Sequence, residues 1–428
     1  MKSFLKKILQ RILFVLARAV LNKYEPKVIG VTGSIGKSST KEAIFTVLKD
    51  KFRVRQNIKN YNNEIGLPLT ILGELSPGGN LLGWLKLFFN AVKLWVIDDK
   101  TFPEALILEM GVDRPGDMAY LVRLAKPDIG VITNIGPVHL EYFKTIENIA
   151  HEKGILVERL RAGGWGVLNA DNEHTAKLKN NVKGRFLTYG FSSEAAVRAH
   201  DVTLLSQKND LQGVSFKLSY DGKVVPVFLP EVLGEHLIYG ALAAVAVGII
   251  MGLNLVEITE ALQSFRAPSG RMRLIEGVRD SLIIDDTYNA SPEPTVAAVQ
   301  VLGKLPANGR KIAVLGDMLE LGDFEDKGHR LVGQTVAQEG IDLLIVVGDR
   351  VKIIAEAAIE AGFSRKHVIK FVDSEEAGDY LLKELNAGDL VLIKGSQGMR
   401  MEKTVKIILA DLSLAKELLV RQDDSWLK

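Results

Sequence analysis

The stretch KVIGVTGSIGKSSTKEAIFTVLKDKF, residues 27–52, decides the fold of the region around it. It opens with a short apolar, β-branched run that predicts a buried strand, and its second half carries apolar residues at helical spacing. A strand, a glycine-containing turn and the start of a helix bring backbone N–H groups and the positive end of a helix dipole around an anion. The stretch therefore predicts a phosphate-binding loop.

The sequence of this loop differs from the usual pattern of a phosphate-binding motif. In the standard spacing a glycine stands five places before the Gly-Lys pair, and here that place holds Val31. Gly33 and Gly36 still permit close approach of the backbone to an anion. Lys37 can reach the outer phosphates, and the hydroxyl of Ser38 can bind a magnesium ion. An ordinary strand-to-helix turn is the alternative, and the Lys-Ser pair favours the phosphate site.

The composition sets outer bounds on the fold and the partners. With 428 residues, of which 47% are hydrophobic and 25% charged, the chain can bury two or three ordinary cores. The absence of cysteine excludes disulfides and thiolate metal sites, which fits a reducing cytoplasm. The net charge of +2 is too balanced for bulk nucleic-acid binding, and we expect no nucleic-acid partner.

The N-terminal segment is a basic element in its own right. Residues 1–30 hold seven lysines and arginines against Glu25, so that they carry +6 and the remainder −4. Helical spacing in residues 1–24 predicts a basic amphipathic helix, which suits the inner surface of a membrane or packs on the protein itself. The uninterrupted run ILFVLA is too short to span a bilayer. The predicted apolar face consists of Leu5, Ile8, Leu9, Ile12, Val15, Leu16 and Ala19.

A second apolar stretch, NLLGWLKLFFNAVKLWVI at residues 80–97, carries two lysines and no acid. We favour a buried helix for it, because most helices of this composition are buried in the core. Contact with a membrane and the lining of an acceptor pocket are the alternatives.

Downstream, apolar runs that predict strands alternate with helical patterns. The runs lack polar alternation and are separated by helices, which implies parallel sheets covered on both faces. The segment FRAPSGRM, residues 265–272, combines proline and glycine after a long helical pattern and predicts a domain boundary. The runs are ALILEM, IGVITNI, GWGVLNA, SLIIDD, KIAVLGDM, LLIVVGD, HVIKFVD and DLVLIKGS.

Polar residues that end these runs are candidates for a site. In parallel sheets ligands gather beyond the carboxyl ends of the strands. Glu109, Asn134 and His139 lie at or just after such ends. A carboxylate and an imidazole next to a phosphate loop could bind a magnesium ion that bridges phosphates. The alternatives are a capped strand end for Glu109 and a structural hydrogen bond for His139.

A set of motifs resembles a known family, the Mur ligases, and within it the branch that adds D-Ala-D-Ala to a UDP-N-acetylmuramoyl-tripeptide. The form TGxxGK[ST] is this family's own version of the loop, which accounts for Val31. The matches run in order from residue 27 to about residue 405. The motifs are GVTGSIGKSST, NYNNEIGLPLTIL, EMGVDRPGDMAYL, PDIGVITNIGPVHLEYFKTIENIAHEKGIL, VLNADN, DDTYNASPEP, GDMLELGD and KGSQGMRMEKTV.

The N-terminal pattern and the resemblance together predict an α/β fold in three parts. Residues 1–26 form the basic helix, residues 27–268 a central ATP-binding domain with a P-loop-type parallel sheet, and residues 269–428 a Rossmann-like α/β C-terminal domain. The resemblance also implies a reaction, in which ATP converts a substrate carboxylate into an acyl phosphate and an incoming amine then forms the amide. ATP and Mg²⁺ are the implied cofactors, and the implied product belongs to cell-wall precursor synthesis.

The resemblance assigns roles to residues of the central domain. Lys37 stabilises the phosphates, Ser38 and Glu109 bind the first magnesium ion, and His139 matches the second-metal histidine. Lys153 matches a lysine that is carbamylated in these ligases; without the resemblance it reads as a solvated surface lysine. The implied ATP-binding set is Gly33, Ser34, Gly36, Lys37, Ser38, Ser39 and Asn134.

Further roles fall near the substrate and on the C-terminal domain. Arg271 resembles the family arginine that reaches the ATP phosphates when the C-terminal domain closes. Asp286 resembles the family aspartate that lies beside the ribose or at the hinge. Domain closure would exclude water from the acyl phosphate. The residues that resemble substrate-side positions are Asn60, Asn62, Asn63, Tyr288 and Asn289.

Two departures from the family pattern bear on the substrate. Members of this branch carry an N-terminal domain that holds the UDP-sugar, whereas 26 residues precede the first strand here. The alternatives for this small-molecule or lipid-linked acceptor are a different molecule, a precursor bound by another chain, and a lipid-linked precursor presented at a membrane where the basic helix docks. The adenine-side motif HNxxNALAA appears as HLIYGALAA, with Leu237 and Gly240 in place of asparagines, which leaves the nucleotide preference open.

We expect a monomeric, cytoplasmic ATP-dependent amide ligase that adds an amino acid or a dipeptide. The alternatives are a folylpolyglutamate- or cyanophycin-type ligase and a non-catalytic, membrane-associated binding protein. The presence of Lys37, Glu109, His139 and Lys153 favours an enzyme over the last of these.

Overall fold

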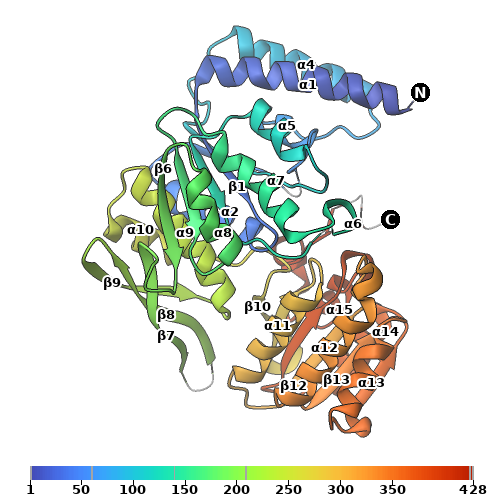
Figure 1. The fold of residues 1–428 in the computed structure, drawn as a ribbon. Helices are drawn as coiled ribbons and strands as arrows, with labels where there is room; N and C mark the ends of the chain where they lie inside the picture. Colours follow the sequence, from blue (N-terminus) through green and yellow to red (C-terminus); the bar gives the residue numbers. More distant parts are fainter. Residues whose placement is uncertain (1, 59–60, 139, 208–209, 424–425, 427–428) are drawn as a thin grey trace. The chain divides into compact units, whose positions relative to one another are not determined.

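The computed structural model describes residues 2–58, 61–138, 140–207, 210–423 and 426 (Figure 1). Asn60 and His139 lie outside these residues. The chain divides into two compact units. The first consists of Met1–Val202, Ser215–Phe228 and Glu235–Phe265, and the second of Thr203–Val214, Leu229–Gly234 and Arg266–Lys428. Both are built from strands and helices, so the predicted α/β class is confirmed.

A nine-stranded sheet, most of which belongs to the first unit, has the order β2-β3-β1-β4-β5-β6-β7-β8-β9. Strand β1 lies between β3 and β4 and pairs with both in parallel, so the loop that follows it opens at the carboxyl edge of the sheet. The strands are β1 (Lys27–Thr32), β2 (Val54–Gln56), β3 (Ala105–Glu109), β4 (Ile129–Ile132), β5 (Trp165–Asn169), β6 (Arg185–Gly190), β7 (Val197–Gln207), β8 (Asp210–Tyr220) and β9 (Lys223–Pro230).

Helices cover this sheet, which is why β3 and β4 are buried at every position. Helix α9 packs against α2, the helix that follows the phosphate loop. The helices are α1 (Lys2–Tyr24), α2 (Lys37–Leu48), α3 (Gly66–Leu72), α4 (Leu81–Val96), α5 (Asp117–Leu124), α6 (Leu140–Phe143), α7 (Ile146–Glu158), α8 (Glu173–Lys177), α9 (Glu235–Ile250) and α10 (Leu255–Leu262).

Helix α1 packs on the first unit through a face that differs from the predicted one. It contacts α3, α4 and α5, and its fully or nearly buried side chains are Leu13, Ala17, Val20 and Leu21. Ile8, Ile12 and Val15, which belong to the predicted face, are instead exposed. The helix is apolar on more than one side, so spacing alone does not select the side that packs.

The prediction of a buried helix at residues 80–97 is wrong for most of α4. Leu87 and Ala91 are its buried residues, whereas Leu82 is 76% exposed and Phe89 70% exposed. The apolar residues on the outer side of α4 lack a covering layer within the described chain. None of the helices in the described chain has an apolar stretch long enough to cross a bilayer.

The second unit has a six-stranded sheet in the order β10-β11-β15-β12-β13-β14. Strand β10 is an antiparallel edge strand and the other neighbours pair in parallel. The strands are β10 (Arg273–Gly277), β11 (Ser281–Asp286), β12 (Lys311–Gly316), β13 (Leu343–Val347), β14 (Val368–Phe371) and β15 (Leu390–Lys394). The helices are α11 (Pro292–Lys304), α12 (Glu325–Gln338), α13 (Lys352–Glu360), α14 (Ser374–Glu384), α15 (Glu402–Ile407) and α16 (Ala415–Leu418).

Candidate active site

The loop between β1 and α2 has the geometry of an anion site. Gly36 stands at the N-cap of α2 with a φ of 86°, a left-handed conformation that glycine adopts without strain. The first N–H groups of a helix find no acceptor within the helix and are therefore available to a ligand.

The end of β4 fixes the shape of this loop. A Cβ on Gly33 would lie 1.9 Å from Thr133 Oγ1, so the two segments touch at a distance that excludes any side chain at residue 33. Ser34 donates its N–H to the Asn134 carbonyl at 2.7 Å, and its hydroxyl bonds the backbone of Gly136. The Ser34 side chain and the Asn134 carbonyl thus hold the loop in place.

Two amines converge on one carbonyl of the loop. Lys37 Nζ donates to the Gly33 carbonyl at 2.8 Å and lies 3.4 Å from the Ser34 carbonyl. Lys153, on α7, donates to the same Gly33 carbonyl at 3.1 Å, across 120 residues of sequence. Lys153 is 2% exposed, so it is not a solvated surface lysine.

The surroundings of Lys153 favour its neutral form. Burial is the largest cause, followed by the positive charge of Lys37, and together they lower the pKa of Lys153 to about 7 in spite of Asp113 and Glu152. The carboxylate of Glu152 accepts the N–H groups of Gly116 and Met118 at the start of α5. An amine with this pKa is largely uncharged at slightly alkaline pH, whereas an ordinary lysine is not.

A second group lies at the end of β3. Because β3 pairs in parallel with β1, Glu109 meets the start of α2, and Ser38 Oγ donates to Glu109 Oε2 at 3.0 Å. Asn62 Nδ2 donates to the other carboxylate oxygen at 3.1 Å. Gly111 makes room for Asn62, since a Cβ there would lie 2.8 Å from the Asn62 side chain.

These oxygen donors fit magnesium, which prefers carboxylate and hydroxyl oxygens. Ser38 and Glu109 supply one of each in direct contact. Among the residues that the structure describes, no three or more acids and histidines gather into a metal-binding group. The predicted ligand His139 is not among those residues.

The other predicted residues of the first unit lie close by with different partners. Ser39 is buried in the first turn of α2. Its backbone lies against Gly240 of α9, where a Cβ would be 3.4 Å away. The side chain of Asn63 accepts the N–H groups of Ile65 and Gly66 at the start of α3. Leu237 is fully buried.

Sequence reasoning missed two residues of this site. Thr133 touches the loop at Gly33, as described above, and donates its hydroxyl to the Ile35 carbonyl. Asn57 accepts the backbone N–H of Glu109 and is 2% exposed. Thr133 directly follows the apolar, fully buried strand β4, a signal that could have found it. Asn57 follows β2, whose sequence VRQ is not apolar and gave no such signal.

The predicted residues of the second unit form their own cluster. The register of β11 and β15 places Asp286 opposite Lys394, and the two form a buried ion pair at 2.6 Å. Lys394 also donates to the Asn289 carbonyl at 3.0 Å. The guanidinium of Arg271 stacks on the ring of Tyr288, 3.8 Å from its centre. The predicted roles of these residues toward nucleotide and substrate stay predictions.

The Asp286–Lys394 pair yields a test of stability. We expect Lys394→Met to lower the free energy of unfolding by about 3–5 kcal/mol, because it leaves a buried carboxylate without its partner. Urea unfolding of the full chain measures this. Lys403→Met, which removes an exposed ion pair with Glu375, is the matched control and should change little. Equal midpoints for the two variants would contradict the expectation.

Comparison with known protein families identifies the class of enzyme to which this chain belongs. The family model for the Mur ligase middle domain matches residues 90–248, and the model for the Mur ligase, glutamate ligase domain, matches residues 270–397. With the phosphate loop and the acids at the strand ends, these matches define an ATP-dependent ligase that forms C–N bonds.

Similar proteins narrow the class to a branch. The UDP-N-acetylmuramoyl-tripeptide–D-alanyl-D-alanine ligase of Bacillus subtilis is 33% identical over 92% of this chain and 78% of its own length. The enzyme of that name from Escherichia coli is 30% identical over 92% and 79%. The crystal structure of MurF ligase from Thermotoga maritima in complex with ADP has a TM-score of 0.75 at 28% identity, covering 96% of this chain and 84% of that one. The chain belongs to the Mur ligase family, in its MurF branch, which confirms the resemblance seen in the motifs.

Proposed function

We propose that this chain uses ATP to join D-Ala-D-Ala to a UDP-N-acetylmuramoyl-tripeptide in peptidoglycan precursor synthesis. The match over 92% of the chain to ligases of that name carries the proposal. A carboxylate oxygen of the tripeptide attacks the γ-phosphorus of ATP, ADP leaves, and an acyl phosphate forms. The dipeptide amine then attacks the acyl carbon, inorganic phosphate leaves, and the new amide nitrogen loses a proton.

In the proposed reaction the phosphate loop neutralises the charge of ATP and holds its phosphates in place. Lys37 leaves the Gly33 and Ser34 carbonyls when ATP binds and neutralises phosphate oxygens instead. Five positioning residues keep the backbone N–H groups of the loop directed at the nucleotide. They are Gly33, Ser34, Gly36, Ser39 and Asn134. Ser38 and Glu109 would hold a magnesium ion, which when bound neutralises charge on the phosphates.

Lys153 is proposed to work as a carbamate. Its Nζ attacks the carbon of CO₂, an N–C bond forms, one proton leaves, and the product carries a negative charge on two oxygens. The step needs a neutral amine, and burial beside Lys37 favours that form. The carbamate would offer magnesium the oxygen ligands that an ammonium group cannot.

The acceptor and its contacts complete the proposal. Asn62 orients Glu109, and roles for Asn60 and Asn63 toward the acceptor stay predictions. A lipid-linked acceptor and membrane contact through residues 1–24 also stay predictions.

An enzyme assay on purified full-length protein tests the function. We expect phosphate release from ATP only when Mg²⁺, D-Ala-D-Ala and UDP-N-acetylmuramoyl-tripeptide are all present, with a product whose mass equals the sum of both substrates less one water. Lys37→Ala should abolish release, whereas Lys49→Ala, at the exposed lysine that directly follows α2, should not. If phosphate is released with a lipid-linked muropeptide but not with the UDP-linked one, or only with a folate and glutamate, the proposed acceptor is wrong and that substrate takes its place.

A further inference from the structure

Helix α4 exposes a continuous apolar row. Leu81, Leu85, Phe89, Val92 and Val96 follow at intervals of three or four residues and are all exposed, Leu81 by 73% and Val96 by 68%. They lie on the side opposite Leu87 and Ala91, which pack on the core. Soluble monomers seldom expose an apolar row of this length without a partner for it.

Helix α1 extends this surface. The two helices lie side by side (Figure 1), and Lys23 and Tyr24 of α1 bond the carbonyls of Leu94 and Ile97 at the end of α4. The exposed residues Ile8, Ile12 and Val15 add a second apolar row on α1.

The charge on this surface is predominantly positive, although Glu64 pairs with Lys6 and Asp98 with Lys23 at its border. The sequences of α1 and α4 contain eight lysines and arginines and no aspartate or glutamate. Lys7 and Arg11 are exposed next to the apolar row of α1, and Lys86 and Lys93 are exposed next to that of α4. An apolar face bordered by cations is typical of helices that lie in the interface of an anionic membrane.

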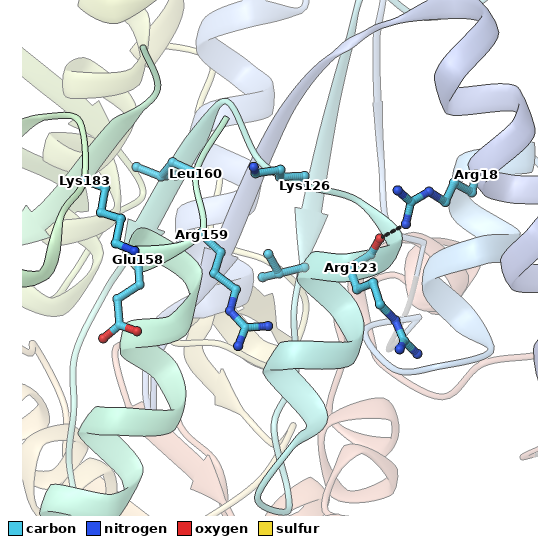
Figure 2. A pocket seen from close by; sticks show the side chains of 8 residues that line it. Arg18, Arg123, Lys126, Glu158, Arg159, Leu160 and Lys183 are labelled. Carbon is cyan, nitrogen blue, oxygen red and sulfur yellow. Dashed lines mark hydrogen bonds between the residues drawn. The ribbon is translucent and has the colours of Figure 1, made fainter. Parts of the chain in front are cut away.

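A basic pocket continues the surface beside α1. It has a volume of about 470 Å³, and Figure 2 shows the side chains that line it. Arg18 of α1 donates to the Arg123 carbonyl at 2.9 Å, which ties the pocket to the helix. The cationic lining is Arg18, Arg123, Lys126, Arg159 and Lys183, with Glu158 as the one acid among the lining residues; Asn181 donates to that carboxylate at 2.8 Å.

The pocket lies at the edge of the sheet opposite the phosphate loop. Lys126, Arg159 and Lys183 precede β4, β5 and β6, so they lie at the amino ends of parallel strands. The phosphate loop follows the carboxyl end of β1. A ligand bound at the amino edge therefore leaves the carboxyl edge open to ATP and substrates.

We infer that α4, α1 and this pocket form one docking surface for a bilayer that contains acidic phospholipids. The apolar rows would enter the headgroup region, and the pocket would bind lipid phosphates. A second copy of the chain is disfavoured as the occupant, because two surfaces that carry many more cations than acids repel each other. The inference does not rest on the proposed ligase function.

Vesicle flotation of the full-length protein tests the inference. We expect the protein to float with vesicles of phosphatidylcholine mixed with phosphatidylglycerol, to stay behind with phosphatidylcholine alone, and to be released by salt. Phe89→Glu should lower the bound fraction on the order of ten-fold through the apolar row, and Lys126→Glu with Lys183→Glu by a similar factor through the pocket. Val372→Glu, at an apolar residue of the second unit that is 77% exposed, is the matched control and should float like the wild type.

Circular dichroism and thermal unfolding establish that each variant is folded. Flotation that all variants share equally would overturn the inference, and so would failure of the wild type to bind acidic vesicles. A dimer in sedimentation that Phe89→Glu dissolves would assign the surface to a second copy instead. None of these readouts depends on ligase activity.

Discussion

Lys153→Ala is expected to lower the ligation rate by at least about a hundred-fold, because it removes a charged group that would act beside the phosphates. Lys153 contacts the phosphate loop directly at the Gly33 carbonyl. It is also buried, so no solvent group can readily take its place. Phosphate release under saturating substrates measures the effect, and turnover of the variant at the wild-type rate would remove the carbamate from the mechanism.

The same residue predicts a pH and CO₂ dependence. With a pKa of about 7, roughly one in ten Lys153 side chains is neutral at pH 6 and roughly nine in ten at pH 8. Since the neutral amine is the form that reacts with CO₂, activity should rise through this range and fall when CO₂ is stripped from the buffer. Carbon-13 bicarbonate should give a carbamate signal in the wild type that Lys153→Ala lacks. Activity that ignores CO₂ at pH 8 would count against the carbamate while leaving a role for the amine.

Gly33→Ala is the second change with a large expected effect. The new Cβ would lie 1.9 Å from Thr133 Oγ1 and 3.1 Å from the backbone of Asn134, at a φ of 154°. The loop must move away from β4, which displaces the N–H groups that would bind phosphate. We expect the free energy of unfolding to fall by about 1–3 kcal/mol and ATP affinity to fall at least about ten-fold.

Gly163→Ala is the control that distinguishes the steric clash expected in Gly33→Ala from the strain of a left-handed backbone. Gly163 has a φ of 76°, but a Cβ there meets nothing within 4 Å. This variant should cost roughly 1 kcal/mol of stability from the backbone conformation and leave ATP affinity unchanged. Calorimetric titration with ATP and urea unfolding measure both quantities. Unchanged ATP affinity in Gly33→Ala would show that the loop tolerates a displacement from β4.

The sequence by itself determined the elements whose signals are local. The strand, turn and helix around Gly33, Gly36 and Lys37 follow from a short apolar run, two glycines and helical spacing, all within 26 residues. Unbroken apolar runs predicted parallel strands because both faces of such a sheet are covered. The order of the motifs indicated the family, and the comparisons confirm it.

Tertiary structure alone decided which distant residues meet and which surfaces stay open. Lys153 reaches Gly33 across 120 residues because α7 packs against β4 and β1, and no spacing in the sequence encodes that contact. Residues 80–97 have the composition of a buried helix, yet α4 is exposed along its outer side. The hydrophobic pattern of a sequence indicates which side chains are apolar. Whether another layer of the protein covers those side chains depends on how the whole chain packs.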